Sequence, residues 1–166
     1  LARWDGYRTQ VHRSDPKTPG ALPDNVIQTL HGDAAGRLWV GTSAAGLVRY
    51  DAAGDRFVTY PVGPTGLSHV SIRQIADDGA GGLWVATDAG LDQLDPATGK
   101  VRRWAVDGSQ GLAGGRVNTV LRSRQGRLVR IEFQNENLVA IEDGEALATV
   151  PDIITLLDRH TARGIV

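Results

Sequence analysis

Short apolar runs alternate with turns rich in glycine and aspartate along most of this chain. The run Val26–His31 leads into a turn at residues 33–36, and the next run, Arg37–Thr42, holds an unbroken Leu-Trp-Val stretch. Such a stretch is typical of a strand that is covered on both faces. Apolar residues do not recur at helical spacing over ten or more positions. The pattern therefore predicts many short strands joined by tight turns.

The pattern repeats at a step of 45 residues. Residues 33–42 read Asp-Ala-Ala-Gly-Arg-Leu-Trp-Val-Gly-Thr, and residues 78–87 read Asp-Gly-Ala-Gly-Gly-Leu-Trp-Val-Ala-Thr. A third copy keeps the Gly-x-Leu centre but has Val129 at the tryptophan position. An aspartate at the first turn position and a glycine at the fourth favour a type I turn. We assign structural roles to the turn and core residues of the first two copies, Asp33, Gly36, Trp39, Asp78, Gly81 and Trp84.

Each repeat divides into four strands, which is the composition of one β-propeller blade of about 40–45 residues. The strands expected in the first two repeats are Val26–His31, Arg37–Thr42, Gly46–Tyr50 and Arg56–Tyr60, then Ile72–Ala76, Leu83–Thr87, Leu91–Asp95 and Val101–Trp104. The third repeat runs from Val117 to about Val150. We predict an all-β fold with blades at 22–66, 67–111 and 112–150 and partial blades at 1–21 and 151–166. Trp4–His12 is expected to be the fourth strand of a preceding blade, and Ile153–Leu157 the opening of a following one.

Composition narrows the possible functions. The chain has 166 residues, no cysteine and a net charge of −1. The absence of cysteine excludes disulfides, thiol catalysis and thiolate metal sites. The balanced charge argues against nucleic acid or an anionic membrane surface as a partner. No apolar run reaches the length of about 18 residues that a membrane span needs, so no membrane contact is expected within this segment. The missing initiator methionine suggests a piece of a longer protein.

The repeats resemble the two-component regulator propeller family. The resemblance rests on the lead-in Leu22-Pro-Asp-Asn-Val, the strand Asp-x-x-Gly-x-Leu-Trp-Val-Gly-Thr and the ending Gly-Leu-x-x-Tyr-Asp, and it weakens from Gly126 onward. It implies a periplasmic sensor region of an inner-membrane signalling protein, with a histidine kinase or a GGDEF diguanylate cyclase as the output. It also implies ligand binding or dimerisation, with the signal relayed through a membrane segment.

No catalytic motif stands out in the sequence. The chain lacks Gly-x-Ser-x-Gly and His-Glu-x-x-His, and its four histidines have no ligand spacing. We therefore predict no catalytic residues, no metal and no cofactor. Superposing the repeats places Gln28, Arg73 and Asn118 at one position of the first strand, with His69 and Arg116 in the loops before it. That strand runs nearest the axis of a propeller, so these five residues are the candidate ligand-binding set.

Two other functions stay open at this stage. Streptogramin lyase-like propellers have comparable Gly-x-Leu-Trp-Val strands, and the resemblance would imply a histidine and acidic residues around a magnesium ion. A generic protein-interaction scaffold is the second alternative. The expected partners are a small molecule or saccharide and a further copy of the chain, because three blades are too few to close a propeller ring.

Overall fold

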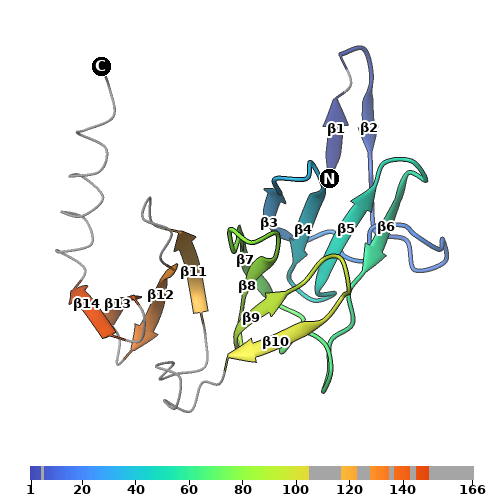
Figure 1. Cartoon of the computed structure of the whole chain (residues 1–166). Coiled ribbons are helices and arrows are strands. Elements are labelled where there is room, and N and C mark those ends of the chain that lie inside the picture. The colour runs from blue at the N-terminus through green and yellow to red at the C-terminus, as the bar shows by residue number, and fades with distance from the viewer. Residues whose placement is uncertain (5, 105–116, 123–127, 135–136, 143–144, 150–166) are drawn as a thin grey trace, which may run out of the picture.

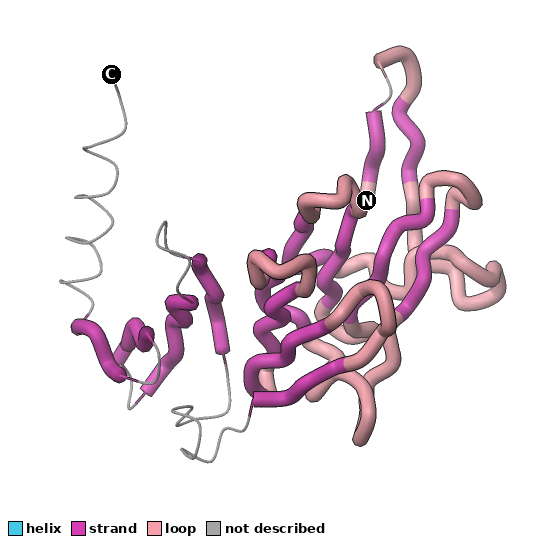
Figure 2. Tube along the Cα trace, in the orientation of Figure 1, coloured by secondary structure: helices cyan, strands magenta, loops and turns pink. Residues whose placement is uncertain are grey.

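The computed structural model describes residues 1–4, 6–104, 117–122, 128–134, 137–142 and 145–149, and within these residues it contains strands and no helix (Figures 1 and 2). Three antiparallel sheets of four strands follow one another along the chain, each in the order of the sequence. The first blade is β3(Ile27–Gly32), β4(Leu38–Thr42), β5(Leu47–Asp51) and β6(Arg56–Thr59). The second blade is β7(Ile72–Asp77), β8(Leu83–Thr87), β9(Gly90–Leu94) and β10(Val101–Trp104), and the third is β11(Val117–Arg122), β12(Leu128–Gln134), β13(Asn137–Glu142) and β14(Glu145–Thr149). The predicted all-β blade fold is confirmed, with strand ends within one residue of those expected in the first two blades.

The 45-residue repeat also fixes the pairing of the strands. Trp39 lies opposite His31, Trp84 opposite Ala76, and Val129 opposite Leu121. All three pairs occupy the same place in their blades. The loss of tryptophan in the third repeat therefore leaves the backbone register of that blade unchanged.

Apolar clusters fill the spaces between neighbouring blades. Between the first and second blades, Trp39 and Leu47 pack with Ile72, Ile75 and further residues of the second blade. The second and third blades share another cluster, which contains Ala86, Leu91, Val117 and Val120. Trp39 and Leu47 are completely buried. The blades thus bury both faces against each other, which explains why their central strands are apolar throughout.

Tight turns join the strands of each blade. The amide of Gly36 donates to the carbonyl of Asp33 (2.8 Å), and Gly36 has a φ of 76°. This left-handed conformation suits glycine, which lacks a Cβ. The Asp33 side chain accepts from the backbone amide of Arg37 (2.9 Å) and from the indole Nε1 of Trp39 (2.7 Å). The turn therefore fixes the orientation of the core tryptophan.

The first residues form a hairpin, β1(Ala2–Trp4) and β2(Thr9–Val11), which extends beyond the first blade (Figure 1). The prediction of a single strand over Trp4–His12 is wrong, because the chain reverses within this segment at Gly6, whose φ is 101°. Leu1 packs into the cluster formed by Leu22, Val40, Val48 and Phe57. The predicted partial blade at 151–166 and residues 105–116 lie outside the described residues.

Candidate functional site at the inner strands

Each blade has a β-bulge at the same position of its first strand. The pairing shifts between Ile27 and Thr29, between Ile72 and Gln74, and between Val117 and Thr119. The extra residues are therefore Gln28, Arg73 and Asn118, the three that superposing the repeats had singled out. A bulge bends the strand and redirects the side chain of its extra residue. Strands β3 and β7 lie side by side, as do β7 and β11, so the bulges form a row across three blades.

Two of the three bulge side chains are joined by a hydrogen bond. Nη1 of Arg73 donates to Oε1 of Gln28 (3.2 Å), while Nε2 of Gln28 donates to Oγ of Ser71 (3.2 Å). Arg73 also forms a two-point ion pair with Asp88, at 2.7 Å from Nε and 2.9 Å from Nη2. The hydrogen bond with Asp88 holds the pKa of the Arg73 guanidinium above its usual value. The pair neutralises itself, so this part of the row is polar without a net charge.

Arg73 has more hydrogen-bond donors than its bonds to Asp88 and Gln28 use. An arginine has five N–H groups, and three of those in Arg73 donate to Asp88 and Gln28. The side chain retains 31% of its exposure to solvent and that of Asp88 retains 20%. Both therefore face solvent in part, with two N–H groups of Arg73 left over after its bonds to the described residues.

The other candidate residues are placed differently. His69 is half-buried, and its Nδ1 accepts from the amide of Ser71 (3.0 Å), so it stabilises the loop before β7. Nδ2 of Asn118 is buried and has no hydrogen-bond partner among the described residues. No described bond joins Asn118 to Arg73, whereas the amide of Val120 in the same strand donates to Oε1 of Gln74 (3.0 Å). Arg116 lies outside the described residues.

Sequence reasoning missed Asp88 and Ser71. Asp88 stands 45 residues after Ser43, as Arg73 stands 45 residues after Gln28. Going from the first blade to the second, glutamine and serine at these two positions are replaced by arginine and aspartate, which carry opposite charges. The appearance of opposite charges at both positions in the same repeat is the one signal in the sequence that is consistent with the ion pair between Arg73 and Asp88.

A second polar network lies deeper, on strand β9. Asp92 is completely buried, and its Oδ2 accepts from the amide (2.7 Å) and the hydroxyl (2.8 Å) of Ser68. The Ser68 hydroxyl also contacts Oγ1 of Thr87 at 2.8 Å. Desolvation raises the pKa of Asp92 despite these hydrogen bonds, and its Oδ1 is buried without a partner among the described residues.

Two hollows lined by described residues lie away from the bulge row. An open hollow of about 660 Å³ is lined by turn residues of the second blade that include Asp78, Gly82, Asp95 and Lys100. A smaller, apolar hollow lies between β1 and the first blade. Within the described residues, no group of three histidine or acidic side chains is arranged to hold a metal ion. No helix long and apolar enough to cross a membrane occurs in that part of the chain.

Two family models match the sequence. The two-component regulator propeller model matches residues 21–44 and 66–89, the first halves of the first two blades. A model named S-Me-THD-like, C-terminal domain matches residues 83–166, just over half of the chain. The second match begins at the first residue of β8 and so divides the second blade, whose sheet continues from β7 to β10. No curated protein matches the chain.

Solved structures match over most of the chain. The extracellular domain assigned to a hybrid two-component system of B. thetaiotaomicron superposes on 90% of it with a TM-score of 0.75 and 22% identity. A second extracellular domain of this kind from the same organism gives a TM-score of 0.70, also over 90% of the chain and at 22% identity. The chain spans about a fifth of each, 22% and 21%. These similarities show the fold.

Proposed function

Since the chain belongs to the two-component regulator propeller family, and over residues 83–166 to the S-Me-THD-like, C-terminal domain family, we propose that it is a sensor segment which binds a ligand at its inner strands. The observation that carries the proposal is the row of bulges in three adjacent blades, with Gln28, Arg73 and Asp88 bonded across the first two. A bulge residue is extra to the ladder, so its side chain can serve a purpose other than strand pairing.

The chemistry of this row favours a neutral polar ligand. Arg73 and Asp88 neutralise each other at a separation of 2.7 Å, so an ionic ligand would have to compete with an existing two-point ion pair. A ligand with several hydroxyl groups, such as a saccharide, would instead use the remaining N–H groups of Arg73 and the amide groups of Gln28 and Asn118. We therefore propose a saccharide or a similar neutral, hydroxyl-rich small molecule.

The proposed setting is the extracytoplasmic part of a membrane-bound signalling protein. The matched solved structures are named as extracellular domains of hybrid two-component systems, which supports this placement. In this role the segment itself is noncatalytic, and the output is a histidine kinase or a diguanylate cyclase across the inner membrane. Ligand binding in the periplasm would shift the blades or their self-association, and that change would pass to the output domain.

Binding is tested by adding neutral disaccharides (maltose, lactose and cellobiose) at millimolar concentration to ¹⁵N-labelled protein and following its amide signals. We expect the largest shifts at Gln28, Arg73 and Asn118. The double variant Arg73→Gln/Asp88→Ser, which gives the second blade the residues of the first, should weaken binding at least several-fold at unchanged melting temperature. Arg102→Gln, at an exposed position of β10, is the matched control. Shifts confined to other surfaces would place the site elsewhere, and no shift with any of the three sugars would contradict the saccharide assignment.

A further inference from the structure

The turn between β7 and β8 repeats the turn between β3 and β4, with one exchange. Oδ1 of Asp33 accepts from two amides of its turn, one of them that of Arg37 (2.9 Å). Oδ1 of Asp78 accepts from two amides in the same way, one of them that of Gly82 (2.8 Å). Gly82 stands 45 residues after Arg37. The two turns are thus capped alike, but the second lacks the arginine side chain of the first.

In the first blade, the Arg37 side chain closes over this turn. Its Nε donates to Oδ2 of Asp33 (2.6 Å), and its guanidinium lies over the ring of Trp39, 5.7 Å from the ring centre. The Asp33 side chain retains only 3% of its exposure to solvent. The first blade therefore contains a complete guanidinium site, made of a carboxylate and an indole.

In the second blade, the place of this guanidinium is a hollow. Gly82 has no side chain, and both Gly82 and Asp78 line the open hollow of about 660 Å³. Asp78 is half-buried, and its Oδ2 accepts from Nε2 of Gln93 (2.8 Å). A carboxylate oxygen can accept more than one hydrogen bond, as Oδ2 of Asp33 does. The bond from Gln93 therefore does not prevent Asp78 from binding a guanidinium.

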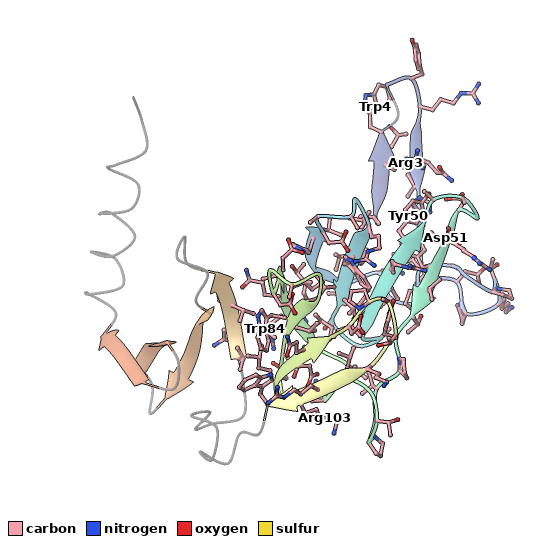
Figure 3. The ribbon with its side chains drawn as sticks, in the orientation of Figure 1. Arg3, Trp4, Tyr50, Asp51, Trp84 and Arg103 are labelled. Atoms are coloured by element: carbon pink, nitrogen blue, oxygen red, sulfur yellow. The ribbon has the colours of Figure 1, made fainter. Side chains whose placement is uncertain are left out.

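A tryptophan stands next to the hollow, as it does beside Arg37 in the first blade. Trp84 is the counterpart of Trp39, and it lies opposite Gln93 in the ladder (Figure 3). Trp39 is completely buried, whereas Trp84 is half-buried. The face of an indole attracts a guanidinium, so the exposed part of Trp84 adds to the match with the first blade.

The rest of the lining carries groups of both charges. Asp95 and Lys100 line the hollow from the turn between β9 and β10, and Arg102 lines it from β10. All three are exposed, and the guanidinium of Arg102 lies over the ring of Trp104 at 4.6 Å. Together with Asp78, the lining holds two carboxylates and two cations. This balance favours a ligand that also carries both charges.

We propose that this hollow binds a free amino acid with a guanidinium side chain, with L-arginine as the probe. The guanidinium takes the place that Arg37 fills in the first blade, beside Asp78, and the carboxylate pairs with Lys100. A guanidinium suits this place because its planar fork of N–H groups can donate two parallel bonds to a carboxylate. A hollow of about 660 Å³ is within the range of small-molecule sites. The site lies at the opposite end of β7 from Arg73, so it is separate from the row of bulges.

Titration of ¹⁵N-labelled protein with L-arginine tests the proposal. We expect the largest amide shifts at Asp78, Gly82 and Gln93, with those of Gln28 and Arg73 unchanged. L-Citrulline, which has the shape of arginine but a neutral ureido group, should bind at least about tenfold more weakly, because a hydrogen bond between charged groups is lost. Agmatine, which lacks the carboxylate, should also bind more weakly. Equal binding of citrulline would overturn the guanidinium assignment, and equal binding of agmatine would overturn that of an amino acid.

Gly82→Arg fills the hollow from within the chain. It gives the second blade the arginine of the first, so it should abolish binding of L-arginine. A Cβ at Gly82 would meet Oδ2 of Asp78, so the carboxylate has to move, and the melting temperature of the variant shows whether it still folds. Ala52→Arg, at an exposed turn position of the first blade, adds the same side chain elsewhere and should leave binding unchanged.

Asp78→Asn remains a test if Gly82→Arg does not fold. It removes the charge but keeps a side-chain oxygen to cap the turn, and it should weaken L-arginine binding at least about tenfold. Binding that survives Asp78→Asn, or that survives Gly82→Arg in a folded protein, would overturn the proposal. An absence of shifts with L-arginine, or shifts confined to the row of bulges, would overturn it as well.

Discussion

The first and second blades share a backbone register but differ in their polar interiors. In the second blade Asp92 takes the place of Val48, since each lies opposite an equivalent valine of the neighbouring strand, Val85 and Val40. The lead-in changes with it, because Ser68 stands 45 residues after Pro23. Proline has no N–H to donate, whereas the amide and hydroxyl of Ser68 both donate to Asp92.

This difference shows that a repeat conserves its strand pairing more strictly than its interactions. The half-buried amide and hydroxyl of Ser68 need an acceptor, and Asp92 provides one at the cost of a desolvated carboxylate. Pro23 requires no acceptor, so a valine suffices in the first blade. The two blades thus reach the same shape through two internally consistent sets of contacts.

The largest effect is expected from Trp39→Ala. Trp39 is completely buried between the blades and its indole donates to Asp33, so truncation should cost about 3–5 kcal/mol of unfolding free energy. Trp84 is half-buried, and Trp84→Ala should therefore cost less. Urea denaturation of both variants measures the difference. Equal losses would mean that the two tryptophans are equally enclosed, against the packing described here.

Gly41→Ala should come next. A Cβ at Gly41 would lie 2.5 Å from Cγ2 of Thr29 and 2.7 Å from Cγ2 of Ile72 in the second blade. Such overpacking typically costs about 1–3 kcal/mol. Ala86 stands at the matched position of the second blade and is accommodated there. If Gly41→Ala were neutral in a denaturation series, the first two blades would be no closer together than the second and third.

The interaction between Ser68 and Asp92 is tested by a double-mutant cycle. Asp92→Val should cost about 1–3 kcal/mol, because it removes the acceptor of the half-buried Ser68 amide and one of the two partners of the Ser68 hydroxyl. Ser68→Pro, added to Asp92→Val, recreates the pair of the first blade and should recover part of that loss. Strictly additive unfolding free energies for the two substitutions would show that Ser68 and Asp92 are not coupled.

The smallest effect expected is a difference in pH dependence. Because burial raises the folded-state pKa of Asp92, the folded protein binds that proton more tightly. Its contribution to stability is therefore greatest at low pH and decreases as the pH rises through the unfolded and then the folded pKa. Relative to Asp92→Asn, the unsubstituted protein should lose stability as the pH rises above about 4.

Asp33 should respond in the opposite direction. Burial by itself would raise the pKa of Asp33, but hydrogen bonds from Trp39 and Arg37 outweigh it and lower the pKa. Its contribution is present above the unfolded pKa and is lost as the pH falls through the folded one. Unfolding free energies of Asp33→Asn and Asp92→Asn, each compared with the unsubstituted protein between pH 3 and 7, should diverge in opposite directions. Parallel curves would contradict these assignments.

The repeat made the blades predictable from sequence. The 45-residue step from Trp39 to Trp84 placed the strands of the first two blades to within one residue, since glycine and aspartate mark the turns. The reversal at Gly6 was missed, although aspartate followed by glycine is a hairpin signal. Because the segment was aligned with β6, one strand was expected where two occur.

The candidate site was less predictable. Repeat alignment brought Gln28, Arg73 and Asn118 to one position, but it gave no sign that this position is a bulge, because a bulge depends on pairing with the next strand. It also could not separate side chains that bond to each other, such as Gln28 and Arg73, from one that lacks a described partner, Asn118. The buried Asp92 was not predicted, because aspartate is mostly exposed to solvent in folded proteins.

The most direct test of the blade arrangement uses the absence of native cysteine. The double variant Gln28→Cys/Arg73→Cys, treated with a short bis-maleimide, should form a cross-link within one chain, because these residues lie in hydrogen-bond contact across neighbouring blades. Gln28→Cys/Thr98→Cys, with the second cysteine in the outer turn of the second blade, should not. Intramolecular cross-linking of the first pair alone would support the stacked blades and the row of bulges. Failure of that pair, or cross-links formed only between chains, would contradict both.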